Sequence, residues 1–297
     1  MTAAPPGAIV ANDHGGQPLG NRNLFVNPPR EIGTPRSCYS TLAAGVVPRT
    51  QAKRLVSTAL WGLGFLIGFT ILNPLLGLVA GIVGGLIGWF KTGFKHTVTW
   101  VGRDGIARYV CKGSTSQMVK NEVLRFDAAT ELRTSATKHY RNGVYTGTSY
   151  THTWTDSGGR ALMTITGMYR AKTGMPASTD PYLFAVAAEA SWSEALLARI
   201  EQEFRVKGSV EFHLTGPDFV RLGNGWIELS IKGKSDRREA KDIAKVELQK
   251  GRFTVEMVDA KKGFFSSTGV FGFDYGALSN ARVFMLVLSR LTGLQLS

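Results

Sequence analysis

Histidine and cysteine are the residues of this 297-residue chain whose side chains most often bind metals or act as nucleophiles. The chain has five histidines, and no two of them are three or four residues apart, as a zinc-binding helix requires. His139 and His152 flank an Asn142-Gly143 dipeptide and could approach each other across two strands, but positions on the face of a sheet are the simpler interpretation. We therefore expect no bound metal.

The two cysteines do not lie in a pattern that is typical of nucleophiles or of a disulfide scaffold. Cys38 lies in a segment rich in Pro and Gly, and Cys111 lies in a strand-like run where a thiol packs as a small apolar side chain. The sequence contains neither a Gly-x-Ser-x-Gly elbow nor a complete P-loop motif. We therefore expect no catalytic residue and no cofactor, and we interpret the protein as one that is not an enzyme.

A dense group of basic residues follows the predicted strand at 226–231, with Asp236, Glu239 and Asp242 among them. Each base near an anionic lipid leaflet can contribute about 1 kcal/mol of attraction, so the group is a candidate site for lipid head groups. A solvated turn of mixed charge is the alternative. Aromatic residues do not alternate with these bases as in a nucleic-acid stacking platform, so we expect no nucleic-acid partner. The candidate lipid-binding residues are Lys232, Lys234, Arg237, Arg238 and Lys241.

The overall composition combines few charges with a strong excess of base. Charged residues make up 19% of the chain, below the roughly 25% of average soluble domains, yet the formal net charge is +13. The hydrophobic fraction of 43% argues against an intrinsically disordered protein. Because the basic residues are spread along the chain, they do not form a single nucleic-acid-binding tail.

The low charge has a local source, because residues 55–90 contain no charged residue and no histidine. As one straight helix this segment would extend about 54 Å, well beyond the roughly 30 Å of a bilayer core. Asn73-Pro74 lies at its middle and predicts a turn between two helices. The segment predicts a transmembrane helical hairpin over residues 51–93, and a hairpin buried within a protein is the alternative.

Basic residues on both flanks of this segment predict that both ends of the hairpin are cytoplasmic. The chain would then be an integral protein of the cytoplasmic membrane with both termini in the cytoplasm, and the lipid membrane would be its first partner. The flanking bases are Arg49, Lys53 and Arg54 on one side and Lys91, Lys95 and Arg103 on the other.

Glycines recur every four residues in both halves of the apolar segment, and such spacing lets helix backbones approach closely. One interpretation is that one half of the hairpin packs against the other. A second is a homo-oligomer of several hairpins, which gives an alternative function: a glycine-zipper oligomer that permeabilises or remodels membrane, with the rest of the chain as sensor. The candidate packing residues are Gly64, Gly68, Gly77, Gly81 and Gly85.

The remaining segments divide the chain into a tail and two similar units. Residues 1–50 show no sustained periodicity and predict a disordered tail. Residues 94–206 predict antiparallel strands, including 131–141 and 144–155 around Asn142-Gly143, and then a helix that begins at Asp180-Pro181. Residues 207–297 repeat this order and end in a helix that Ser279-Asn280 would cap.

The second unit resembles bacterial pleckstrin-homology-like (PH-like) membrane proteins of unknown function. The residues that carry the resemblance are the strand at 271–275, Leu278-Ser279-Asn280, the helix at 283–288, Asp242-Ile243 and Gly251. The resemblance implies an α+β fold in which the transmembrane hairpin precedes two PH-like units, each an antiparallel sheet with a C-terminal helix. It further implies a non-enzymatic, membrane-anchored binding or scaffolding protein, whose cytoplasmic units engage anionic lipid head groups or a protein partner.

Overall fold

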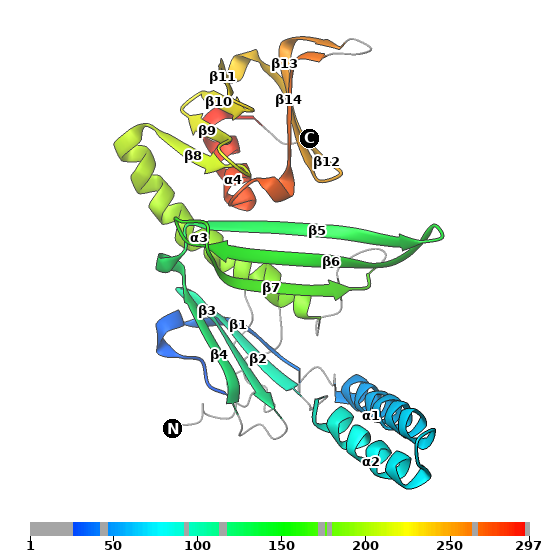
Figure 1. The fold of residues 1–297 in the computed structure, drawn as a ribbon. Helices are drawn as coiled ribbons and strands as arrows, with labels where there is room; N and C mark the ends of the chain where they lie inside the picture. Colours follow the sequence, from blue (N-terminus) through cyan, green and yellow to red (C-terminus); the bar gives the residue numbers. More distant parts are fainter. Residues whose placement is uncertain are drawn as a thin grey trace.

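The protein has an α+β architecture in which two units of similar order lie one above the other (Figure 1). Its structure is a computed structural model that describes residues 26–41, 47–91, 95–112, 118–171, 176, 180–262 and 267–294. Each unit contains a four-stranded antiparallel sheet, a three-stranded antiparallel sheet and a closing helix. The two units therefore have the same order of sheets and closing helix.

The first unit begins with a short 3₁₀ helix, η1 (Arg30–Ile32), which precedes its four-stranded sheet. A second 3₁₀ turn, η2 (Phe126–Ala128), leads from that sheet to the three-stranded one. The four-stranded sheet contains β1 (Pro35–Ser40), β2 (Lys95–Gly102), β3 (Gly105–Lys112) and β4 (Met118–Arg125). The three-stranded sheet contains β5 (Glu131–Arg141), β6 (Val144–Thr155) and β7 (Ala161–Tyr169), and the helix α3 (Pro181–Lys207) follows.

The second unit has the same order, including a 3₁₀ turn, η3 (Ala240–Asp242), between its sheets. Its four-stranded sheet contains β8 (Ser209–His213), β9 (Phe219–Gly223), β10 (Trp226–Ile231) and β11 (Lys234–Glu239). Its three-stranded sheet contains β12 (Ile243–Gln249), β13 (Arg252–Lys262) and β14 (Ser267–Asp274), followed by η4 (Tyr275–Ala277) and the helix α4 (Ala281–Thr292).

Local sequence signals explain several of these boundaries. Asn142 and Gly143 have φ angles of 50° and 76°, which a two-residue turn of this hand requires, and the predicted strands on either side are confirmed. The side chain of Asp180 accepts a hydrogen bond of 2.9 Å from the backbone N–H of Tyr182, so the predicted start of α3 is confirmed too. Gly208, with a φ of 69°, ends that helix.

The prediction of transmembrane helices is wrong, and with it the integral membrane localisation with both termini cytoplasmic. In the part of the chain that the structure describes, no helix is both long enough and apolar enough to cross a membrane. Two helices, α1 (Val47–Thr70) and α2 (Pro74–Lys91), occupy this region. At about 1.5 Å per residue, the uncharged part of α1 extends about 24 Å and α2 about 27 Å, short of a core of about 30 Å.

The helix pair, α1 with α2, lies inside the first unit because it connects β1 to β2. The expected tail at 1–50 therefore contains an element of the fold: Cys38 in β1 pairs with Trp100 in β2, and Cys38 is fully buried. Residues 1–25 lie outside the described residues, as do the side chains of the flanking bases except Arg103.

One hydrophobic core joins the two units. It includes Trp154 of β6, Trp192 of α3, Phe212 of β8 and Phe284 of α4, which are all fully buried. Phe126 meets Trp192 edge to face at 5.6 Å between ring centroids, and Phe212 meets Phe284 in the same way at 5.3 Å. The units are therefore two halves of one packed body.

Candidate functional site

The predicted lipid-binding residues lie on and around the β10–β11 hairpin. Lys232 and Gly233 form its turn, with φ angles of 54° and 74°. The backbone N–H of Lys232 donates a 3.0 Å hydrogen bond to the side chain of Asp218, which fixes the turn to the start of β9. Lys234 opens β11, and Lys241 lies in η3 just after that strand. We call residues 232–241 the basic turn.

The strand register divides the basic turn between two faces. Arg237 pairs with Glu228 on the outer face, and its guanidinium lies 3.7 Å from the centre of the Trp226 ring. Arg238 pairs with Ile227 on the opposite face, where it forms a 2.9 Å ion pair with Asp236. The five predicted residues therefore do not form one continuous surface, although four of them, Lys232, Lys234, Arg237 and Lys241, are exposed.

The predicted packing glycines serve two different purposes. A Cβ added at Gly77 would meet Thr70, and one added at Gly81 would lie 3.1 Å from Leu66, so these glycines face α1. Gly85 is also close to α1, at ordinary contact distance from Thr58. A Cβ at Gly64 or Gly68 would meet nothing within 4 Å. The glycines of α2 thus allow the two helices to approach, as does Gly62 of α1, whereas Gly64 and Gly68 face open space.

The surface of the helix pair is apolar and exposed. Leu60 is 65% exposed, and at the connection between the helices Ile71 and Leu72 are 83% and 76% exposed. A shallow groove of about 440 Å³ runs along α1. It is lined by Leu60, Trp61, Gly64, Phe65 and Phe69. Apolar surface on this scale marks a place where a partner excludes water.

The helix pair and the basic turn lie at opposite ends of the molecule. Figure 1 places α1 and α2 beside the first sheet at the bottom of the view, and β10 and β11 near the top, with the long sheet β5–β6–β7 between them. A flat surface that touches the helix pair would therefore not reach the basic turn at the same time.

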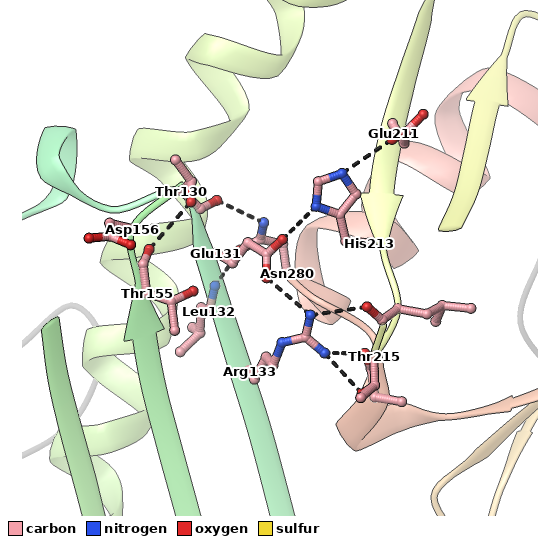
Figure 2. A network of polar contacts seen from close by, with 12 residues as sticks. Thr130, Glu131, Leu132, Arg133, Thr155, Asp156, Glu211, His213, Thr215 and Asn280 are labelled. Atoms are coloured by element: carbon pink, nitrogen blue, oxygen red, sulfur yellow. Dashed lines mark hydrogen bonds and ion pairs between the residues drawn. The ribbon is translucent and has the colours of Figure 1, made fainter. Parts of the chain in front are cut away.

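A polar network joins the two units at the start of β5 (Figure 2). The side-chain oxygen of Asn280 accepts hydrogen bonds from the backbone N–H of Leu132 and from the indole of Trp192, both at 2.9 Å. Its side-chain N–H donates to the carbonyl of Thr130 at 3.2 Å. The sequence predicts Asn280 as a helix cap, but its side chain makes no capping bond to α4 and instead ties that helix to β5 and α3.

The network continues across the outer face of the second unit. Glu131 of β5 contacts His213 of β8 at 2.6 Å, and the other ring nitrogen of His213 lies 3.2 Å from Glu211. Arg221 of β9 then bridges Glu211 and Glu228. A neutral imidazole has one N–H, so His213 donates to both carboxylates only when it is protonated. No sequence motif marks these residues, since they meet only through strand register.

Of the remaining side chains capable of chemistry, Cys38 and His152 are buried, Tyr275 is partly buried and His139 is exposed. Burial raises the pKa of the Cys38 thiol to about 12 and the pKa of the Tyr275 hydroxyl to about 12, so both stay protonated at neutral pH. His139 and His152 do not approach each other: His139 bonds Ser149 at 2.8 Å, and His152 faces Glu189 at 3.7 Å. Among the residues that the structure describes, no three His, Cys, Asp or Glu side chains gather as a metal site.

Neither a protein-family model nor a curated protein matches this chain. The PH-like resemblance therefore stays a prediction. The two exposed features at the ends of the molecule, the apolar helix pair and the basic turn, are its candidate binding surfaces.

Proposed function

We propose that the protein is a non-enzymatic binding protein that attaches to one leaflet of a membrane through its helix pair. Its two sheet units are then held away from that membrane. The observation that carries this proposal is the apolar exposure of α1 and α2 on several sides, with no charge from Leu55 to Phe90. A helix that is apolar all round has no stable place in water.

Lipid is favoured over a protein groove because exposed side chains lie on both helices and at their connection. Leu63 and Ile67 on α1 and Leu78 and Ile82 on α2 are all more than half exposed. Each Å² of apolar surface removed from water contributes about 25 cal/mol. A helix pair that lies in the interface without crossing it buries such a surface against acyl chains.

The basic turn supplies a second contact, with an anionic partner. Lys232, Lys234 and Lys241 are exposed, and Figure 1 places the β10–β11 hairpin, which carries the first two, at the far end from the helix pair. Because the two ends point to different surfaces, the protein would act as a scaffold between a lipid surface and a second anionic surface. The order of four strands, three strands and a helix in each unit supports a PH-like binding module.

Vesicle binding by the full chain tests the proposal. We expect the wild type to float with both neutral and anionic vesicles and to cluster the anionic ones, because its ends bind separate surfaces. The variant Leu60→Glu/Leu78→Glu should lose flotation with neutral vesicles and should float with anionic ones only at low salt, through its unchanged basic turn. The variant Lys232→Glu/Lys234→Glu/Lys241→Glu should still float but no longer cluster anionic vesicles.

A matched control is Lys138→Glu/Arg141→Glu, which reverses two exposed charges on the β5–β6 hairpin. It should bind and cluster as the wild type does. Undiminished flotation of the Leu60→Glu/Leu78→Glu variant with neutral vesicles, with its fold intact by circular dichroism, would overturn the role of the helix pair. Clustering that survives reversal of the basic turn would overturn the role of that turn.

A second candidate is the glycine-zipper oligomer that remodels membrane, and the open face at Gly64 and Gly68 favours it. Association of two copies along this face would be lost in Gly64→Leu and kept in the control Val79→Leu, at an exposed position of α2. Chemical crosslinking on vesicles distinguishes the two variants, and equal crosslinking of both would exclude an interface at Gly64.

A further inference from the structure

A second apolar depression lies far from the helix pair, between the two closing helices. It has a volume of about 470 Å³ and lies between the C-terminal half of α3 and α4, with β8 beneath. Ile200, Val210 and Val287 are buried at its floor, and Leu286 is half exposed at its edge. The residues that line it are Leu197, Ile200, Glu201, Phe204, Arg205, Val210, Leu286, Val287, Arg290 and Leu291.

Three charged residues surround this groove. Arg290 of α4 forms a 2.9 Å ion pair with Glu201 of α3, which connects the two helices across the opening. Arg205 lies one turn further along α3, is exposed, and has no ion pair within the described part of the chain. The three charges sum to a positive rim, with Arg205 as the donor available to an incoming anion.

We infer that this groove binds a single-chain amphiphile with an anionic head group, its apolar chain between α3 and α4 and its head at Arg205. Ligand sites for small molecules are apolar clefts of roughly 300–1,000 Å³ with a few placed polar groups, which is what this groove offers. A guanidinium binds a carboxylate through two parallel N–H groups, so a fatty carboxylate suits the rim.

The size of the groove argues against a helix from a protein partner. One helical turn about 10 Å wide and 5.4 Å long fills roughly 420 Å³. The groove would thus hold about one turn, whereas a docked helix anchors itself over positions i, i+3, i+4 and i+7. An acyl chain is much narrower than a helix and can bend to follow a groove of this volume.

Photoaffinity labelling of the full chain tests this inference. The probe is a palmitic acid analogue with a diazirine at its methyl end, used below its micelle concentration, and the adducts are mapped by mass spectrometry. We expect adducts on residues 197–210 and 286–291 that unlabelled palmitate removes by competition. The neutral alcohol hexadecanol should compete about tenfold less well, because it lacks the charge-assisted contact with Arg205.

Two variants separate the groove from the apolar helix pair, which also attracts acyl chains. Arg205→Glu and Leu286→Arg both change exposed positions and should each reduce the groove adducts about tenfold. The control Arg282→Glu, at an exposed position of α4 outside the groove, should leave the adducts unchanged. Adducts confined to α1 and α2, or groove adducts that palmitate does not displace, would overturn the site. Equal competition by hexadecanol would overturn the anionic head group.

Discussion

Asn280 is the residue on which the contact between the two units depends most. Its backbone N–H donates to the carbonyl of Leu132 at 2.7 Å, and its side chain returns a bond to the same residue, so it completes the edge of β5 as a strand would. The same amide holds the indole of the fully buried Trp192. This geometry requires a φ of 54°, which asparagine tolerates better than most residues.

Replacing Asn280 with glycine should therefore lower the free energy of unfolding by about 2–4 kcal/mol, because it leaves buried groups of β5 and Trp192 without partners. Glycine readily adopts the same left-handed backbone conformation, so the lower free energy of unfolding reflects the missing Asn280 side chain. The matched control is Asn142→Gly in the exposed β5–β6 turn, where φ is 50° and the change should stay within about 0.5 kcal/mol. Urea denaturation measures both, and equal losses would contradict the bridging role.

Glu122 should make stability depend on pH in the acid range. Burial raises its pKa, but hydrogen bonds from Lys120 and Arg108 outweigh burial, so the net pKa lies below its ordinary value. A carboxyl with a depressed pKa stabilises the fold above its unfolded pKa, and this contribution is lost as the pH falls through the folded pKa.

The substitution Glu122→Gln should therefore destabilise the protein by about 1 kcal/mol at neutral pH and by progressively less on acidification. Urea unfolding over a pH series gives this difference directly. The exposed Glu239→Gln serves as control and should show a small, constant difference. A gap between wild type and Glu122→Gln that widens at low pH would contradict the assignment.

At the scale of elements, glycine decides how closely α1 and α2 pack. A Cβ at Gly84 would lie 2.7 Å from the carbonyl oxygen of Trp61, and one at Gly88 would lie 2.9 Å from that of Ser57. These are backbone atoms, which cannot move aside without separating the helices. The four-residue spacing in the sequence thus predicts close packing, but it does not distinguish inward from outward glycines.

We expect Gly84→Ala to increase the distance between spin labels placed on α1 and α2. By contrast, Gly64→Ala meets open space and should leave that distance unchanged, while raising helix stability by about 1 kcal/mol through propensity. Electron paramagnetic resonance on the full chain measures the distance. A larger shift for Gly64→Ala than for Gly84→Ala would show that the packed face has been assigned to the wrong side.

At the scale of the whole molecule, the shared core predicts that both units unfold together. Phe284 of α4 contacts Phe212 and Phe253 of its own unit, while its helix is tied through Asn280 to β5. Phe284→Ala should cost about 3–5 kcal/mol and should raise amide exchange in β5–β7 as much as in β12–β14. Hydrogen exchange with mass spectrometry tests this, and faster exchange in the second unit alone would indicate independent units.

Local patterns in the sequence determined those elements that depend on interactions between neighbouring residues. The turn at Asn142-Gly143, the start of α3 at Asp180-Pro181 and the break between α1 and α2 at Asn73-Pro74 depend only on neighbouring φ angles and hydrogen bonds. The exposed bases could also be found in this way, because charge is a property of the residue itself. The order of strands followed by a helix in each unit came from the same local signals, but β1, β4 and β11 were not predicted.

Tertiary structure alone decided what depends on distant contacts. β1 has few local signals and exists because it pairs with β2 across the inserted helix pair. Strand register put Arg237 and Arg238 on opposite faces, and helix packing formed the groove between α3 and α4. The helix pair illustrates this difference most clearly. An uncharged run of residues predicts apolar helices, but the length of each helix and its position in the fold determine what the helix contacts.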